Sequence, residues 1–324
     1  MTTPLDRSAS WPFEHGEAGR YTYARADHPT GVACEAALGA LDGGRALLFP
    51  SGTAAATAVL LTIARPGATI ALAEGAYYGT AVLFRYLEPW GISLVEYDQT
   101  GAPPAEADIV WVEAPANPML TMPDLDAATA HDAPVVCDST VATPLVLRPL
   151  DRGCAIVLHS ATKYLGGHDD LLAGVVVVRD DDLYERLHTT RRLTGLIADA
   201  DTAWLLLRGL ETLELRLARQ TATAGVVAER LRGHPAVSVV RYPGFGGLIS
   251  FDVADGAAAL RVEQSVRLIT NSTSLGATRS KMESRHRWEG DRCPPGLLRL
   301  SIGVEDPDEI WSDLGQALTR ASRP

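Results

Sequence analysis

The residues best suited to covalent chemistry follow a short apolar run at residues 155–159. Ser160, Thr162 and Lys163 provide two hydroxyl groups and one primary amine within four positions. In α/β proteins, reactive groups gather where strands end. The hydroxyls suit a phosphate and the amine suits a Schiff base, so the trio predicts a site for a phosphorylated aldehyde cofactor. A solvated surface lysine, beside hydroxyls that cap a turn, also fits these residues.

Two further segments offer groups that bind charge. Gly52 and Thr53 follow Ser51 and open an alanine-rich helix, and the free N–H groups at such a helix start attract anions. Asp138 is the acid that directly follows the apolar run 134–137. A carboxylate there would keep a pyridine nitrogen protonated, although a turn or helix cap is the alternative for an isolated Asp.

Pyridoxal phosphate requires a lysine, a carboxylate, an aromatic face and an anion cradle. Lys163 and Asp138 supply the first two, and Tyr77 or Tyr78 offers an aromatic face. Taken singly, each tyrosine also fits a core or subunit-contact position. The candidate cofactor-binding residues are Gly52, Thr53, Tyr77 or Tyr78, Asp138, Ser160, Thr162 and Lys163.

These residues require a scaffold that brings distant strand ends together. Between residues 69 and 178, short apolar runs alternate with helical stretches, which is typical of a parallel sheet covered by helices. The mixture of strands and helices that follows predicts a small α+β domain. We therefore expect an α/β fold with three parts: an N-terminal arm over 1–30, a large cofactor-binding domain with a mostly parallel sheet over 31–205, and a C-terminal α+β domain over 206–324.

Hydrophobic periodicity places the individual elements. The expected strands are 69–73, 93–97, 109–113, 135–138, 155–159, 175–178, 237–241, 248–253, 268–275 and 297–302. The expected helices are 31–41, 79–90, 124–131, 183–192, 204–218, 222–232, 257–266 and 308–320. Thr30 is the expected N-cap of the first helix.

Composition restricts the classes of function. The 324 residues carry 29 Lys and Arg against 40 Asp and Glu, a formal charge of −11, which disfavours binding to nucleic acid or to anionic lipid. No apolar run is long enough for a membrane span, and the first residues lack a signal-peptide pattern. The four cysteines show no metal-ligand spacing. We expect a cytoplasmic protein without a metal that acts on a small molecule.

A continuous motif around Lys163 resembles the Cys/Met-metabolism family of pyridoxal-phosphate enzymes, the cystathionine synthase and lyase group with the aspartate aminotransferase fold. The family pattern S-A-T-K-Y-x-x-G-H-x-D is similar to residues 160–170 of this chain. Further elements that are similar to the family's are residues 23–30, 51–55, 113–118, 138–140, 274–276 and 298–303. The resemblance covers the chain from about residue 21 to its end.

The resemblance implies roles for the cofactor-side residues. Lys163 would bond pyridoxal 5′-phosphate and then take the Cα proton of an amino acid. Asp138 would hold the pyridine nitrogen protonated. Tyr77 would stack on the ring and donate a proton to the leaving group. Lys163 and Tyr77 are therefore the expected catalytic residues.

The resemblance also implies substrate and partner contacts. Arg299 would pair bidentately with the substrate carboxylate, helped by Asn117 and Ser274. Tyr23 and Arg25 would reach the phosphate of the cofactor in a neighbouring subunit. A homodimer at least would follow, and the family's homotetramer is the larger alternative.

The function that the resemblance implies is a lyase or transferase acting at Cβ or Cγ of a sulfur-containing or O-acyl amino acid. We expect a cystathionine γ-lyase; a cystathionine γ-synthase or O-acylhomoserine sulfhydrylase is the alternative, and a non-catalytic cofactor-binding subunit is a third hypothesis. Tyr78 and Thr273 depart from the family pattern near the distal end of the substrate. The charged segment 278–289, with Arg285 and Arg287, is either a solvated loop or a contact for an acidic substrate.

Overall fold

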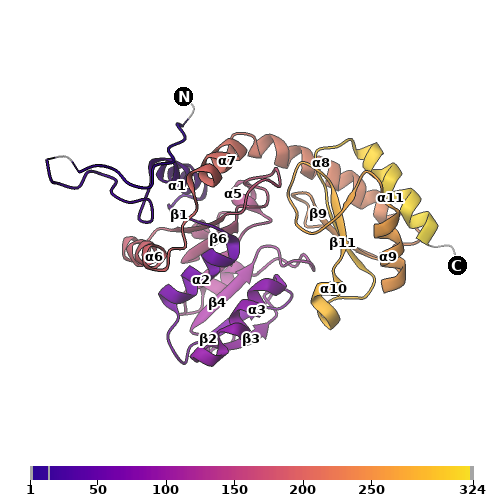
Figure 1. Cartoon of the computed structure of the whole chain (residues 1–324). Helices are drawn as coiled ribbons and strands as arrows, with labels where there is room; N and C mark the ends of the chain where they lie inside the picture. The colour runs from indigo at the N-terminus through magenta and orange to yellow at the C-terminus, as the bar shows by residue number, and fades with distance from the viewer. Residues whose placement is uncertain (1–2, 14, 322–324) are drawn as a thin grey trace.

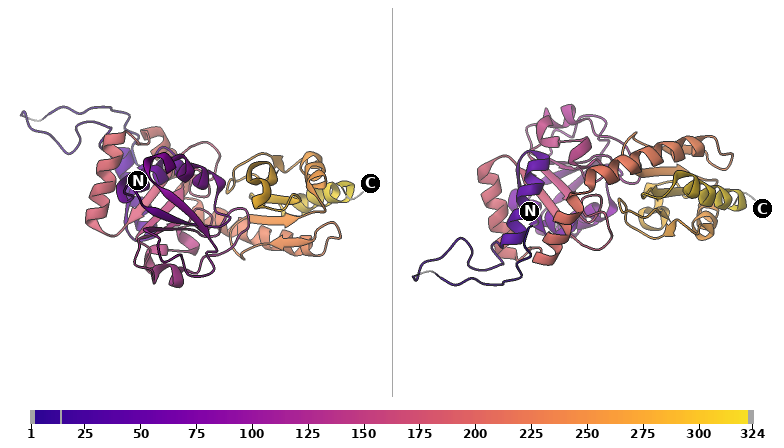
Figure 2. Two further views of the ribbon diagram at one scale, coloured as in Figure 1. Left: turned by 90° about the horizontal axis from the view of Figure 1, so that it is seen from below. Right: turned by 90° about the horizontal axis from the view of Figure 1, so that it is seen from above.

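The computed structural model describes residues 3–13 and 15–321. Its two sheets lie beside each other, each with its own helices (Figure 1). Helices α7 (Ala200–Leu210) and α8 (Leu213–Arg232) follow each other from the larger sheet to the smaller one. The extended chain before α1 projects from the side of the larger sheet, away from the C-terminus (Figure 2).

The larger sheet has the strand order β1-β7-β6-β5-β4-β2-β3. Its strands are β1 (Arg45–Phe49), β2 (Thr69–Ala73), β3 (Ser93–Tyr97), β4 (Ile109–Glu113), β5 (Val135–Asp138), β6 (Ile156–Ser160) and β7 (Gly174–Val178). Strands β2 to β6 pair in parallel, which confirms the expected mostly parallel sheet. β7 is antiparallel to both of its neighbours, because it follows β6 without the crossover helix that a parallel return needs.

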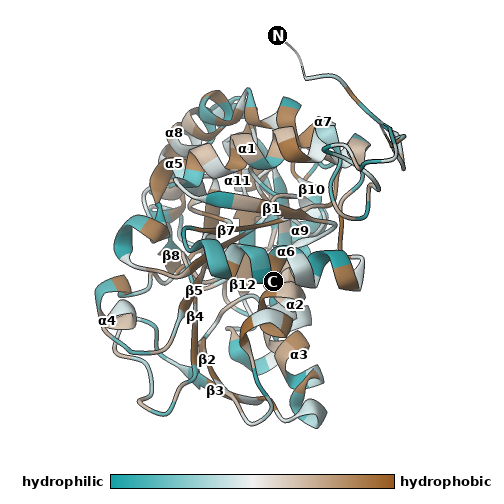
Figure 3. Cartoon of the chain, turned by 90° about the vertical axis from the view of Figure 1, so that its left-hand side faces the viewer, coloured by the Kyte–Doolittle hydropathy of each residue, from teal (hydrophilic) through white to brown (hydrophobic). Residues whose placement is uncertain are grey.

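Helices cover both faces of this sheet, so its central strands are apolar along their length (Figure 3). The helices are α1 (Pro29–Asp42), α2 (Gly52–Ile63), α3 (Tyr78–Tyr86), α4 (Leu125–Thr129), α5 (Thr143–Val146) and α6 (Asp181–Thr194), with 3₁₀ turns at Glu88–Trp90 and Pro149–Arg152. Alternate residues of β6 enter different cores: Leu158 belongs to the apolar cluster that contains Val59 of α2, and Val157 to the cluster that contains Leu38 of α1. This two-sided burial fixes which side chains face the site.

The start of α1 differs from the prediction. Its N-cap is His28, whose Nδ1 accepts a hydrogen bond from the Gly31 N–H at 3.1 Å. Pro29 occupies the first helical position, where its fixed φ and missing N–H suit a helix start. The prediction that Thr30 is the N-cap is therefore wrong by two residues.

The second sheet has the strand order β10-β11-β12-β9-β8. Its strands are β8 (Val239–Arg241), β9 (Leu248–Asp252), β10 (Thr270–Asn271), β11 (Lys281–Ser284) and β12 (Leu297–Ser301). Helices α8, α9 (Gly256–Ser265) and α11 (Pro307–Ala321) pack with it around one apolar cluster, and α10 (His286–Glu289) and a 3₁₀ turn at Gly290–Arg292 follow β11. Neither β11 nor α10 was predicted.

Two other predictions in this region are wrong. The helix expected over 204–218 is broken, because α7 ends at Leu210 and α8 then runs unbroken to Arg232. The strand expected over 268–275 shrinks to β10, because the Asp313 carboxylate accepts the N–H groups of residues 267–269 at 2.8–2.9 Å. These N–H groups therefore bond to a helix side chain instead of a neighbouring strand.

Candidate active site

A cavity of about 340 Å³ is lined by residues of both sheets. Parallel strands β4, β5 and β6 contribute residues at or next to their carboxyl ends, where α/β folds place ligands. The sequence-predicted residues that line it are Gly52, Thr53, Tyr77, Asn117, Asp138, Ser160, Thr162, Lys163, Ser274 and Arg299. Segments more than 200 positions apart in the chain thus meet in one place.

Lys163 lies in the turn that follows β6, and its amine points to the segment between β10 and β11. The Nζ atom donates a hydrogen bond to Oγ of Ser274 at 3.0 Å. Burial, and then the positive charge of Arg299, lower the pKa of Lys163 to about 8. Arg216 holds the turn by donating to the carbonyl oxygens of Tyr164 at 2.8 Å and Gly209 at 2.7 Å. A fixed amine with this pKa is suited to proton transfer near neutral pH.

Asp138 is the last residue of β5. Its Oδ1 atom accepts from the Thr140 N–H at 3.0 Å and from the Thr140 hydroxyl at 2.5 Å. Burial raises the pKa of Asp138, and the two donations from Thr140 oppose that rise. The Thr140 Oγ1 atom also accepts the Ser160 N–H at 2.8 Å, so one threonine orients the carboxylate and joins it to β6.

The start of α2 forms a small cradle against the end of β6. Ser51 caps the helix by accepting the Ala54 N–H at 3.0 Å. A Cβ atom on Gly52 would lie 2.9 Å from Cβ of Ser160, so only glycine fits this approach. The Thr162 hydroxyl accepts the Ala173 N–H at 3.0 Å and lies 3.3 Å from its carbonyl oxygen. Thr162 is thus bonded to its own turn as well as lining the cavity.

Tyr77 precedes α3 and is partly exposed to the cavity. Its backbone N–H donates to Oε2 of Glu113 at 2.6 Å, and its ring meets Tyr78 edge-on at 5.1 Å. Burial, together with Tyr78, raises the pKa of Tyr77. Glu113 is buried, and its burial and the nearby Asp138 raise its pKa well above the usual range. Glu113 therefore links the start of α3 to the end of β4.

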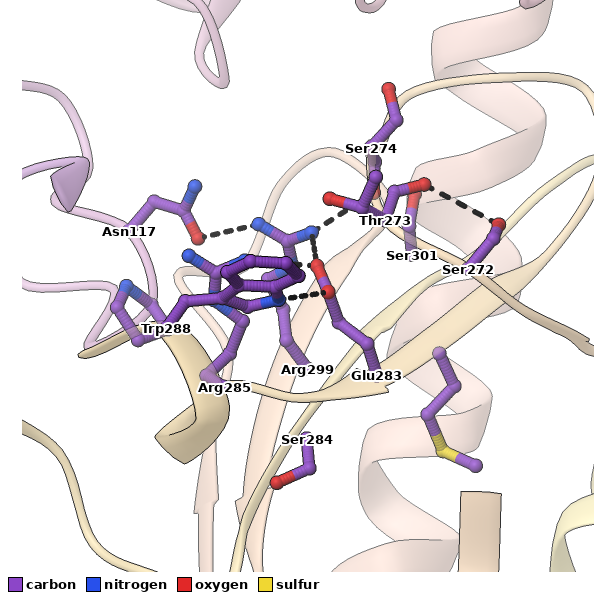
Figure 4. Close-up of polar contacts among 12 residues, drawn as sticks. Asn117, Ser272, Thr273, Ser274, Glu283, Ser284, Arg285, Trp288, Arg299 and Ser301 are labelled. Atoms are coloured by element: carbon purple, nitrogen blue, oxygen red, sulfur yellow. Dashed lines mark hydrogen bonds and ion pairs between the residues drawn. The ribbon is translucent and has the colours of Figure 1, made fainter. Parts of the chain in front are cut away.

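Arg299 lies on β12 (Figure 4) and is buried, with 3% of its surface exposed. Its Nη1 atom donates to Oδ1 of Asn117 at 3.0 Å, and its Nη2 atom donates to the carbonyl oxygen of Ser274 at 3.0 Å and to Oε1 of Glu283 at 2.5 Å. Burial and the neighbouring Arg285 lower its pKa to about 10. Ser274 adopts a left-handed backbone with φ of 80°, which allows it to contact both Arg299 and Lys163.

The two arginines of the charged segment have different surroundings. Arg285 lines the cavity and is 1% exposed, with Nη1 donating to Glu283 at 2.9 Å and Nη2 donating to Glu289 at 2.8 Å. Arg287 instead pairs with Glu263 and is not among the residues that line the cavity. The segment is therefore not the uniformly solvated loop that was one of the two alternatives.

Tyr23 and Arg25 do not line the cavity of their own chain. Tyr23 is 52% exposed, and the Arg25 guanidinium donates to the carbonyl oxygen of Arg192 at 2.8 Å. Two residues further along the chain, the Asp27 carboxylate accepts a hydrogen bond from the Arg191 guanidinium at 2.9 Å, which holds this end of the arm on α6. In the single chain, Tyr23 and Arg25 therefore make contacts outside the cavity.

Within residues 3–13 and 15–321, no group of three or more His, Cys, Asp or Glu side chains is placed to hold a metal ion. No helix in the same residues has the length and apolar content to cross a membrane. Cys34, Cys137, Cys154 and Cys293 are free and buried.

Comparison with known proteins identifies the family. The sequence model of the family described as Cys/Met metabolism PLP-dependent enzyme matches residues 1–319. The chain belongs to this family. A putative cystathionine gamma-lyase of Streptomyces coelicolor is 38% identical over 331 aligned residues, which cover 93% of this chain and 84% of the relative. A cystathionine gamma-synthase of Mycobacterium tuberculosis is 35% identical and covers 94% of this chain and 87% of the relative.

A solved structure agrees with this assignment. The crystal structure of cystathionine gamma synthase from Xanthomonas oryzae pv. oryzae, in complex with aminoacrylate and cysteine, is similar with a TM-score of 0.93 and 33% identity. The similarity covers 99% of this chain and 93% of that chain. As a member of the Cys/Met metabolism PLP-dependent enzyme family, this chain is a PLP-dependent enzyme.

The cavity fits the cofactor of the Cys/Met metabolism PLP-dependent enzyme family. The amine of Lys163, the carboxylate of Asp138 and the cradle left open by Gly52 match an aldehyde, a pyridine nitrogen and a phosphate. Sequence reasoning gave no role to four residues with clear contacts here: Glu113, Thr140, Glu283 and Trp288. Glu113 and Thr140 lie inside family motifs, so motif spacing could have found them; Glu283 and Trp288 lie in the charged segment 278–289, where only Arg285 and Arg287 were considered as contacts.

Proposed function

We propose that the enzyme is a lyase that eliminates the γ-substituent of a sulfur-containing amino acid, with cystathionine as the first candidate. The observation that carries the proposal is the convergence of the Lys163 amine, the Asp138 carboxylate and the Arg299 guanidinium on one cavity. The 38% identity to a putative cystathionine gamma-lyase supports it. Gamma replacement is the second candidate, because a cystathionine gamma-synthase is also 35% identical to this chain.

The proposal assigns cofactor contacts to residues of the larger sheet. Lys163 would bond the aldehyde carbon of pyridoxal phosphate, Asp138 would pair with the pyridine nitrogen and Tyr77 would cover a ring face. When bound, the cofactor withdraws electrons from the Cα of the substrate. The proposed phosphate contacts are Gly52, Thr53, Ser160 and Thr162.

The second sheet would bind the substrate. Arg299 would pair with the α-carboxylate, and Asn117 and Ser274 would orient its guanidinium. Ser274 also accepts from the Lys163 amine, so the carboxylate site and the base are joined through one residue. Lys163 would remove the Cα proton and Tyr77 would donate a proton to the leaving sulfur, since the pKa of Tyr77 is raised and keeps the phenol protonated.

We also propose that the site is completed by a second copy of the chain. Tyr23 and Arg25 belong to the segment that precedes α1, outside their own cavity. In a homodimer at least, with a homotetramer as the larger alternative, residues 1–30 would bring these side chains to the neighbour's phosphate cradle. Arg25→Ala should then weaken cofactor affinity about tenfold; an unchanged dissociation constant for pyridoxal phosphate would reject the contact.

A reducing cytoplasm is the proposed location. The four cysteines are free thiols, and no two of them are joined in a disulfide among the described residues. The net charge of −11 and the amino-acid chemistry of the site suit a small-molecule enzyme with neither a nucleic-acid nor a membrane partner.

The decisive experiment combines a spectrum with a substrate panel. Purified enzyme with pyridoxal phosphate should show a visible absorbance band that is absent in Lys163→Ala. Cystathionine, homocysteine, methionine and O-acyl-homoserines are then incubated separately, with and without a thiol, and products are measured by mass spectrometry. A 2-oxo acid and ammonia without a thiol indicate elimination, whereas a product that requires the thiol indicates replacement. A wild type that remains colourless with excess cofactor would refute both.

A further inference from the structure

Glu283 is a buried carboxylate that contacts Arg299, the residue proposed to bind the substrate carboxylate. It lies on β11 directly opposite Arg299 of β12 in the antiparallel register, and it is 3% exposed. Its Oε1 atom accepts from Arg299 at 2.5 Å and from Arg285 at 2.9 Å. Its Oε2 atom accepts from Nε1 of Trp288 at 3.0 Å. Both oxygens are therefore engaged (Figure 4).

The N–H groups of Arg299 that a substrate carboxylate would need already have acceptors in the ligand-free site. A guanidinium offers a carboxylate two forks, Nε with Nη2 and Nη1 with Nη2, and both include Nη2. The two hydrogens of Nη2 are already directed at the Ser274 carbonyl and the Glu283 carboxylate. A bidentate substrate carboxylate can therefore bind Arg299 only if one of these acceptors withdraws.

Glu283 is the acceptor that can withdraw. The Ser274 carbonyl is part of the main chain, which is held two residues later because the Gly276 N–H donates to the Ser301 hydroxyl at 2.9 Å. Glu283 reaches Arg299 through a side chain with rotatable bonds. It also keeps two other donors, Arg285 and Trp288, after it leaves Arg299.

We propose that Glu283 occupies the carboxylate fork of Arg299 in the ligand-free site and is displaced by the α-carboxylate of the amino-acid substrate. Glu283 thereby sets the affinity of the enzyme for amino acids. Its bonds to Arg285 and Trp288 connect carboxylate binding to α10, whose Trp288 lines the cavity and stacks on Tyr78 at 6.2 Å. The inference rests on the proposed function of Arg299.

The charges around Arg299 predict whether the removal of Glu283 strengthens or weakens substrate binding. Arg285 and Arg299 carry two positive charges, and Glu283 and Glu289 carry two negative charges. Arg292, 3.9 Å from Glu289, is balanced by its own partner Glu96 at 2.8 Å. An incoming carboxylate thus meets a neutral cluster and must compete with a resident anion. Removing the resident anion should tighten the binding of any ligand with an α-carboxylate, because Arg299 is then left without a carboxylate partner.

The test compares two ligands that differ only in the carboxylate. Dissociation constants of L-norleucine and n-pentylamine are measured on the cofactor-loaded enzyme by absorbance titration and calorimetry. Glu283→Gln should bind norleucine about tenfold more tightly, with pentylamine changed less than about twofold. Glu289→Gln is the matched control, because it also removes one negative charge that pairs with Arg285, but Glu289 does not contact Arg299. It should change the ratio of the norleucine and pentylamine dissociation constants less than about twofold.

A second variant separates position from net charge and covers the case in which Glu283→Gln fails to fold. Glu283→Asp keeps the charge but shortens the side chain, so its carboxylate cannot reach Nη2, and norleucine should again bind several-fold more tightly. An unchanged ratio, or weaker norleucine binding, in the folded Glu283 variants would overturn the inference. A wild type that binds neither ligand would instead overturn the proposed function, and the inference would fail with it.

Discussion

The part of the cavity built by the larger sheet and the part built by the second sheet hold charge in different ways. The first, the cofactor wall, contains Gly52, Thr53, Asp138, Thr140, Ser160 and Lys163, whose two ionisable groups are joined to neutral donors and acceptors. The second, the carboxylate wall, consists of Arg285 and Arg299, which line the cavity, and of Glu283 and Glu289, which pair with them; all four are 1–5% exposed.

The difference follows from what each wall would receive. The cofactor wall would gain an aldehyde, a pyridine and a phosphate, so its charged side chains wait for partners and are held meanwhile by Thr140 and Ser274. The carboxylate wall keeps guanidinium groups buried when no substrate is bound, and an unpaired buried charge is costly. A resident carboxylate offsets that cost. We therefore expect the cofactor wall to control chemistry and the carboxylate wall to control both folding and affinity.

The largest effect should come from the cofactor wall and should fall on activity alone. Lys163→Met should lower kcat by about 10⁴-fold, because the amine is both the proposed attachment point and the proposed base. Its free energy of unfolding at neutral pH should equal or exceed that of the wild type. The folded pKa of about 8 lies below the usual 10.5, so burying the protonated amine opposes folding below pH 8 and this opposition fades above it. Steady-state kinetics and urea unfolding check both; a clearly less stable Lys163→Met would contradict the comparison.

A smaller but still large effect should come from the carboxylate wall and should fall on stability as well. Arg299→Leu should reduce the free energy of unfolding by about 3 kcal/mol, because it leaves Glu283 with one guanidinium shared with Glu289. The double variant Arg299→Leu/Glu283→Leu should recover most of this loss, since it removes both members of the buried pair. Urea unfolding of the four proteins forms a double-mutant cycle, and simple additivity of the two substitutions would show that the pair is not coupled.

The same contrast explains how much could be predicted from sequence. The alternating strands, the parallel sheet and the lysine motif are local patterns, so Asp138 and Lys163 could be placed at strand ends. Glu283 could not, because Lys281–Ser284 is a short strand with three polar residues, and its burial depends on distant partners: pairing with β10 and β12, the apolar cluster that includes Met282, and two guanidinium groups. The break between α7 and α8 had one weak signal, Gly209, because a single glycine inside a helical pattern does not by itself end a helix and neither Gly nor Pro stands at residues 211–212.

A more moderate effect tests the charges around Lys163. Lys281 pairs with Asp169 at 2.7 Å, and of these two charges Lys281 lowers and Asp169 raises the pKa of Lys163. The rate at which the cofactor-free enzyme combines with pyridoxal phosphate should rise with pH through a midpoint of about 8, as the free amine becomes populated. Lys281→Met should raise this midpoint, and Asp169→Asn should lower it. Stopped-flow absorbance measures both, and shifts in the same direction would exclude this electrostatic explanation.

The smallest effect should come from Arg287, two residues from Arg285 but outside the cavity. Its guanidinium is 38% exposed and pairs with Glu263 of α9. Glu263 is buried, yet it keeps the Ser284 N–H as a donor at 2.6 Å when Arg287 is removed. Arg287→Ala should therefore change kcat/KM less than about twofold. Arg285→Ala is the matched comparison, and it should weaken binding more because both Glu283 and Glu289 lose their shared cation. A larger kinetic loss in Arg287→Ala than in Arg285→Ala would move the substrate contact to the outer surface of α10.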